Sequence, residues 1–152
     1  MEITYLADHL EYLPILAAWH HGEWGYIRPG DTVEARQLRL GKECGHGEVP
    51  TTVIALENGT LLGSAMLIES DMETRKELSP WLASVFVAPE SRRRGIGAAL
   101  VQRIIHEARA LGFPRLYLYT PSEEQFYASR GWSVLERRQY AGKEATVMAF
   151  PL

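Results

Sequence analysis

The sequence predicts one α/β domain in which helices flank a mixed, mostly antiparallel central sheet. Short β-rich runs alternate with helical segments, and an Asn58-Gly59 turn joins two of the runs as a hairpin. A long helical segment after an apolar strand has the length of a crossover between strands. The 152 residues suffice for one core, and no repeat, low-complexity tract or linker divides residues 1–152.

The N-terminal part predicts one strand and two helices. Residues 2–6 are typical of a short strand, and leucines then recur at helical spacing as far as Trp19 or Trp24. The sequence Asp31-Thr32-Val33-Glu34 has the spacing of a capping box, which predicts Asp31 as the N-cap of a helix that ends near Leu40. The glycine-rich residues 41–50 are predicted to form a loop.

Three strands follow. Residues 51–57 and 60–69 flank Asn58-Gly59, and these two residue types tolerate the positive φ angles of a two-residue hairpin turn. A polar loop covers residues 70–80. Residues 81–87 are apolar on both faces, which predicts a central position in the sheet.

The C-terminal part predicts two helices and three strands. A helix from Gly95 stops at Gly112, and residues 115–120 form the next strand. Ser122 and Gln125 have capping-box spacing and predict a short helix that ends at Gly131. Residues 132–140 and 144–150 form a closing hairpin, so the predicted order is β-α-α-β-β-β-α-β-α-β-β.

Composition excludes several classes of function. The formal net charge of −3 gives no overall attraction to nucleic acid or to an anionic membrane, so we expect neither as a partner. Cys44 is the single cysteine, which excludes an intramolecular disulfide and a multi-cysteine metal site. No secretory or membrane-spanning pattern is present, and we expect a cytoplasmic protein.

Residues 84–100, SVFVAPESRRRGIGAAL, predict a strand, a tight turn and a helix that begins at glycines. The first amides of a helix lack partners and lie at the positive end of its dipole, so this turn favours a phosphate or pyrophosphate. A Walker loop requires Gly-Lys-Ser/Thr, and a dinucleotide fingerprint requires a third glycine where Leu100 stands. Neither pattern fits, whereas Arg92, Gly95 and Gly97 fit the pattern Arg-x-x-Gly-x-Gly.

This motif resembles the acetyl-CoA-binding motif of the GCN5-related N-acetyltransferases, the GNAT family. The preceding hairpin and the later segments RLYLYT and FYASRGW occur in the order typical of that family. The resemblance implies a GNAT-like sheet and acetyl-CoA as the cosubstrate. It also implies that the backbone of Val85 and Val87 contacts the pantetheine arm, and that the turn holds the pyrophosphate through the amides of Arg93, Arg94, Gly95, Gly97 and Ala98.

The implied reaction is direct attack of a neutral primary amine on the thioester carbon. Tyr127 matches the tyrosine that in this family often protonates the departing thiolate, and a backbone N–H of the central strand is the expected oxyanion donor. Some members carry a catalytic carboxylate on the strand that here spans residues 81–87, but this sequence has none. The candidate bases, acting directly or through water, are therefore Glu23, Glu69 and Asp71.

Several alternatives stay open on the sequence alone. A non-catalytic acyl-CoA-binding or sensor module is compatible with the same motif, whereas nucleic-acid binding through the arginines is disfavoured by the acidic balance. His20, His21 and Glu23 crowd one helix end, but such a group more often faces solvent, and we expect no metal. The acceptor amine is not identified, and assembly as a homodimer is left open.

Overall fold

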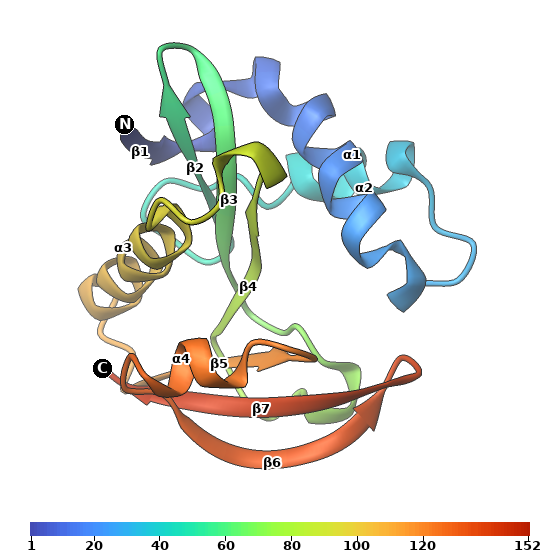
Figure 1. The fold of residues 1–152 in the computed structure, drawn as a ribbon, viewed down its shortest axis with the longest axis vertical. Helices are drawn as coiled ribbons and strands as arrows, with labels where there is room; N and C mark the ends of the chain where they lie inside the picture. The colour runs from blue at the N-terminus through green and yellow to red at the C-terminus, as the bar shows by residue number, and fades with distance from the viewer.

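A seven-stranded sheet with helices on both faces forms the protein, and the computed structural model describes all residues 1–152 (Figure 1). The elements in chain order are β1 (Glu2–Tyr5), α1 (Leu13–Trp24), α2 (Val33–Gly41), β2 (Thr51–Glu57), β3 (Thr60–Ile68), β4 (Trp81–Val87), α3 (Ile96–Ala110), β5 (Arg115–Thr120), α4 (Glu124–Ala128), β6 (Ser133–Tyr140) and β7 (Lys143–Pro151). The predicted class and element order are confirmed.

The strands lie in the order β1-β2-β3-β4-β5-β7-β6. All neighbouring pairs are antiparallel except β4 and β5, which are parallel because α3 crosses over between them. The central position predicted for residues 81–87 is confirmed, since β4 lies between β3 and β5. The first hairpin turns at Asn58 and Gly59, whose φ angles are 52° and 77°.

The two faces of the sheet carry different helices. Val53 and Ala55 of β2 belong to the core that includes α3, whereas Ile54 and Leu56 belong to the core that includes α1. This alternation follows from the two-residue period of a strand. Each fully buried leucine or isoleucine, such as Ile104 of α3, contributes roughly 1.5–3 kcal/mol to this packing.

Both predicted capping boxes are wrong in detail. Thr32, not Asp31, caps α2, because its hydroxyl accepts a hydrogen bond from the Ala35 amide at 3.1 Å. Asp31 instead accepts two bonds from the Arg39 guanidinium, at 2.9 and 2.7 Å. Because the Asp31 carboxylate is engaged in this charge-assisted pair, it does not accept from the first amides of α2.

At α4 the Ser122 side chain does not cap the helix. The hydroxyl of Thr120, at the end of β5, accepts from the amides of Ser122 and Glu123 at 3.3 and 2.9 Å. The first amides before α4 are thus satisfied from the preceding strand, which fixes the helix against the end of β5. None of the helices has the length and apolar character needed to cross a bilayer.

Candidate active site

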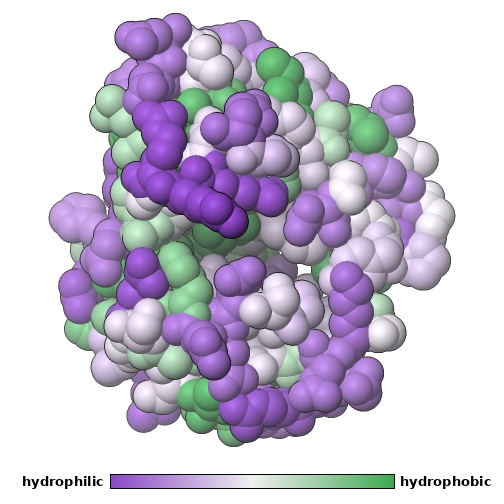
Figure 2. Space-filling view, viewed as in Figure 1, coloured by the Kyte–Doolittle hydropathy of each residue, from purple (hydrophilic) through white to green (hydrophobic).

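A cleft opens at the centre of the sheet because β4 and β5 diverge. Their ladder contains one register pair, Trp81 with Tyr117, at the start of β4. Beyond that pair the strands separate around a cavity of about 1430 Å³, lined by α1, β4, β5, α4 and the turn before α3. Figure 2 shows a hollow across this face, with apolar residues in its depth and hydrophilic residues around its rim.

A β-bulge shapes the wall that β4 contributes. Ser64 of β3 pairs with Phe86 and Met66 pairs with Ala83, so Ser84 and Val85 both lie opposite one residue of β3. Ser84 has a φ of +51°, a conformation that side chains rarely adopt. Such bulges change the direction of a strand's backbone groups, and both residues of this bulge line the cleft.

The predicted phosphate turn lies at one end of the cleft. Gly95 is the N-cap of α3 with a φ of +78°, and no side chain caps this helix. The first amides of a 15-residue helix therefore remain free beside the cleft. A Cβ built on Gly97 would meet only Val87, at 3.7 Å, so the protein leaves space over the backbone there.

Seven of the eight predicted cofactor residues line the cleft: Val85, Val87, Arg92, Arg93, Gly95, Gly97 and Ala98. The eighth, Arg94, does not, because its guanidinium donates to both oxygens of Glu57 on β2, at 3.0 and 2.8 Å. Arg92 donates from Nε to the Val87 carbonyl at 2.9 Å. Arg93 makes no ion pair within the chain, so its side chain is the free cation of the turn.

Tyr127 of α4 lies in the cleft wall with 8% of its surface exposed. Its ring packs edge-on against Phe126 and Trp132, with centroids 5.0 and 5.8 Å away. Burial raises the pKa of the Tyr127 hydroxyl, with a smaller contribution from Glu123. The phenol therefore stays protonated at neutral pH, the state that a proton donor needs.

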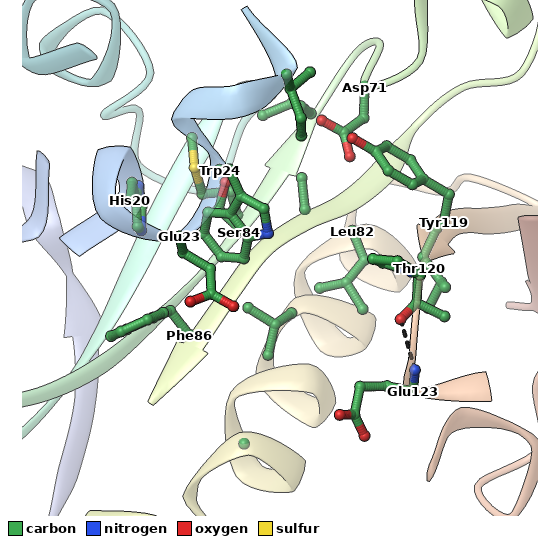
Figure 3. A pocket seen from close by; sticks show the side chains of 18 of the residues that line it. His20, Glu23, Trp24, Asp71, Leu82, Ser84, Phe86, Tyr119, Thr120 and Glu123 are labelled. Atoms are coloured by element: carbon green, nitrogen blue, oxygen red, sulfur yellow. Dashed lines mark hydrogen bonds between the residues drawn. The ribbon is translucent and has the colours of Figure 1, made fainter. Parts of the chain in front are cut away.

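The three candidate carboxylates fall in different places. Glu23, on the last turn of α1, points into the cavity beside Phe86, and Asp71 points from the opposite wall toward Tyr119 (Figure 3). Glu69 is exposed and does not line the cleft. The structure thus brings Glu23 and Asp71, but not Glu69, to the same cavity as Tyr127.

Asp71 has an unusual environment for a carboxylate. It forms no ion pair, and protein surrounds it closely, although the residue keeps some exposed surface. Burial raises the pKa of Asp71 to about 7, against the opposing effects of Arg36 and Arg28, while Glu43 raises it further. A group with this pKa exchanges protons readily near neutral pH, as a general base must.

Sequence reasoning missed a buried polar network next to the cleft, formed by His20, Arg36, Ser64 and Ser84. His20 is 1% exposed and lies within 2.9 Å of the Ser64 hydroxyl and 2.8 Å of Arg36 Nη2. Burial is the main cause that lowers the pKa of His20 well below its usual value, with Arg36 contributing, so the ring is neutral. A serine inside the apolar strand TLLGSAMLI was the available signal.

The described residues contain no group of three His, Cys, Asp or Glu side chains arranged to hold a metal ion. His21 bonds the Asp31 carbonyl at 3.1 Å, whereas His20 faces Ser64. The two histidines are adjacent in sequence, but their side chains contact different residues.

A sequence model described as the acetyltransferase (GNAT) family matches residues 13–132. The chain belongs to the GNAT acetyltransferase family. The matched residues include both strands that frame the cleft and the turn before α3. No curated protein matches the sequence.

Solved structures share the GNAT fold. The ribosomal-protein-alanine N-acetyltransferase of Brucella melitensis is 20% identical, with all of both chains covered and a TM-score of 0.75. An aminoglycoside 6′-acetyltransferase type Ii is 17% identical, with 99% of this chain and 97% of that chain covered and a TM-score of 0.75. The aminoglycoside 6′-N-acetyltransferase solved with coenzyme A is 16% identical over the same shares, also with a TM-score of 0.75.

Proposed function

We propose that this protein transfers the acetyl group of acetyl-CoA to a primary amine by direct attack of the amine on the thioester. The observation that carries the proposal is the cleft between β4 and β5, which joins a free helix N-terminus to a buried tyrosine and two carboxylates. Family membership supports acetyl-CoA as the donor. The aminoglycoside 6′-N-acetyltransferase solved with coenzyme A has the same fold.

The residues at the turn fit an acyl-CoA. Free amides from Arg93 to Ala98 suit the pyrophosphate, and Arg93 adds a charge without a partner in the chain. Because β5 has left β4 there, the backbone of Val85 and Val87 is open to the amide groups of the pantetheine arm. The arm would thus continue the sheet where a strand is missing.

The chemistry uses four groups of the chain. Asp71, directly or through water, accepts a proton from the attacking amine, and Glu23 contacts the acceptor on its way to the thioester. The Val85 N–H, at the bulge, stabilises the negative charge that develops on the carbonyl oxygen. Tyr127 then donates its proton to the departing thiolate. We place Asp71 ahead of Glu69 because only Asp71 lines the cleft.

An acceptor screen tests this proposal. Purified protein is incubated with acetyl-CoA and panels of small amines, peptides with free N-termini and lysine-containing peptides, and released thiol is measured. We expect saturable, acceptor-dependent thiol release. Tight binding of acetyl-CoA by calorimetry without turnover on any amine would favour the alternative, a non-catalytic acyl-CoA sensor. Failure to bind acetyl-CoA or CoA would refute both functions.

A further inference from the structure

A chain of hydrogen bonds runs through the protein interior to the bulge of β4. It begins at Arg36, whose Nη2 lies 2.8 Å from His20 Nδ1, and continues from His20 Nε2 to the Ser64 hydroxyl at 2.9 Å. It ends where the Ser64 hydroxyl donates to the Ser84 carbonyl at 2.9 Å. His20 and Ser84 line the cavity (Figure 3), whereas Ser64 does not.

The chemistry of the two ends fixes the direction of every bond. A carbonyl oxygen only accepts, so Ser64 donates to Ser84, and the Ser64 oxygen must accept from His20 Nε2–H. A guanidinium only donates, so His20 Nδ1 accepts from Arg36. His20 is thereby held in one tautomer as a neutral ring, and successive bonds in such a chain polarise one another.

The Ser84 carbonyl needs this partner because of the bulge. Ser84 and Val85 share one opposing residue on β3, so the regular ladder is interrupted at Ser84, and its φ of +51° turns the peptide out of line. A buried carbonyl without a partner costs about 1–3 kcal/mol. The Ser64 hydroxyl replaces the missing ladder bond and holds the re-aimed peptide in place.

The same peptide group carries the Val85 N–H. In a trans peptide the C=O and N–H point in opposite directions, so fixing the Ser84 carbonyl toward Ser64 also fixes the Val85 N–H away from it. Val85 lines the cleft. We infer that Ser64 and His20 are positioning residues, which hold and polarise the Ser84–Val85 peptide so that the Val85 N–H meets the thioester carbonyl oxygen.

This inference rests on the proposed acetyl transfer, and it extends that function to Ser64, which does not line the cleft, and to His20, which acts through Ser64. A merely structural network would stabilise the fold and leave the bound thioester unaffected. A positioning network would also change the polarisation of the thioester carbonyl. The two roles are therefore separable by a spectroscopic signal from the bound donor itself.

The test is isotope-edited infrared spectroscopy of acetyl-CoA labelled with ¹³C at the thioester carbonyl and bound to the protein. We expect the carbonyl stretch to lie at lower frequency when bound to wild-type protein than in water. In Ser64→Ala the frequency should return toward the value in water, with acetyl-CoA affinity unchanged. With an amine found in the screen, kcat should fall about 10-fold, less than the loss from deleting an oxyanion donor outright.

Thr51→Val is the matched control. The Thr51 hydroxyl is also fully buried and donates to a backbone carbonyl, that of Gly45, at 2.6 Å, but Thr51 does not line the cleft. Its loss should lower the melting temperature and leave both frequency and kcat unchanged. Ser64→Thr, which keeps the hydroxyl, should retain the wild-type signal.

Ser64→Cys nearly keeps the side-chain volume but has a weaker hydrogen-bond donor, and it replaces the alanine variant if that variant does not fold. Its carbonyl frequency should lie between the wild-type value and the value in water. Unchanged frequency and kcat in folded Ser64→Ala or Ser64→Cys, with only the melting temperature lowered, would overturn the positioning role and leave the proposed function standing. Wild-type protein that does not bind the labelled donor would overturn the proposed function, and the inference with it.

Discussion

The two ends of the cleft are built in different ways. The donor end consists mainly of backbone, namely the free amides at the start of α3 and the β5-facing edge of β4, and all of it comes from residues 84–98. The acceptor end consists of side chains from distant segments, with Glu23 on α1, Arg36 on α2 and Asp71 after β3. One short segment encodes the first end, whereas tertiary packing assembles the second.

This difference indicates how each end tolerates change. A site made from backbone depends on turn geometry and on the absence of side chains, so it binds the same ligand despite many substitutions around it. A site made from side chains changes its chemistry with single substitutions. The predictions below test this contrast, beginning with the largest expected effect.

Gly97→Glu should abolish acetyl-CoA binding, with a loss of at least about 1,000-fold, because a side chain and a negative charge would occupy the phosphate position. The fold should survive, since a Cβ at Gly97 meets only Val87 at an ordinary 3.7 Å. Isothermal calorimetry measures the affinity. Gly22→Glu is the matched control, because Gly22 lies on α1 outside the cleft with open space around its Cβ, and it should bind normally. Normal binding by the Gly97 variant would contradict this location of the pyrophosphate.

Asp71→Asn should lower kcat/KM by roughly 100-fold or more at pH 8, within the range for loss of a general base. In wild-type protein the slope of log kcat/KM against pH should decrease by one near pH 7, where Asp71 becomes ionised. Below that pH both Asp71 and the amine must lose a proton, and above it only the amine must. Asp71→Asn should lack this change of slope near pH 7. If the variant keeps the change of slope, the base is another group.

Stability gives an independent check on Asp71. Its folded pKa of about 7 lies above the ordinary value of 3.8, so the native state binds more protons between these values. Stability from this group is therefore present at low pH and is lost as pH rises toward 7. Asp71→Asn should raise the stability at pH 8 by roughly 1 kcal/mol while activity falls.

Glu23→Gln should raise KM for the acceptor and keep the change of slope near pH 7 in log kcat/KM.

Tyr127→Phe should lower kcat by roughly 100-fold with little change in acetyl-CoA affinity, because the ring and its packing remain and only the proton donor is lost. Tyr5→Phe is the matched control. The Tyr5 hydroxyl donates to Glu107 at 2.6 Å outside the cleft, so its loss should reduce stability and leave kcat unchanged. A Tyr127 variant that loses only stability would show that this tyrosine is part of the core and not an acid.

Arg93→Ala should weaken acetyl-CoA binding by roughly 3- to 10-fold, since an exposed charge-assisted contact contributes little beside the backbone amides. Arg94→Ala should change the affinity by less than about 2-fold, because its guanidinium is engaged by Glu57 on β2. Isothermal calorimetry measures the acetyl-CoA affinity of both variants. Equal losses would mean that Arg94 leaves Glu57 to meet the ligand.

The donor end could be predicted from sequence because its determinants are local. The strand before Pro89, the turn and the helix from Gly95 are specified by neighbouring residues, and seven of the eight cofactor residues expected in this segment do line the cleft. The first capping box was misassigned because a partner from the far end of α2 competes for the Asp31 side chain. Asp31 pairs with Arg39, whereas at α4 the Thr120 hydroxyl, two residues before Ser122, accepts from the amides of Ser122 and Glu123.

The acceptor end could not be predicted in the same way. Glu69 and Asp71 lie two residues apart in a loop, and sequence gives no reason why one points into the cleft and the other into solvent. Besides burial, which raises the pKa of Asp71, charges from distant parts of the sequence act on this pKa: Arg36 on α2 and Arg28 after α1 lower it, and Glu43 after α2 adds to the rise caused by burial. The bond between His20 and Ser64 likewise joins residues 44 positions apart.

The separation of β4 from β5 affects how the protein exchanges its amide hydrogens with solvent. The middle of a sheet is normally its slowest-exchanging part, because each strand is covered on both edges. Here β4 loses its β5 neighbour after Trp81, so the amides on that edge should take up deuterium as quickly as those of an outer strand. The interior of the free protein would then contain a strand edge as unprotected as those of β1 and β6, and a bound acyl-CoA would be visible first as slowed exchange in β4.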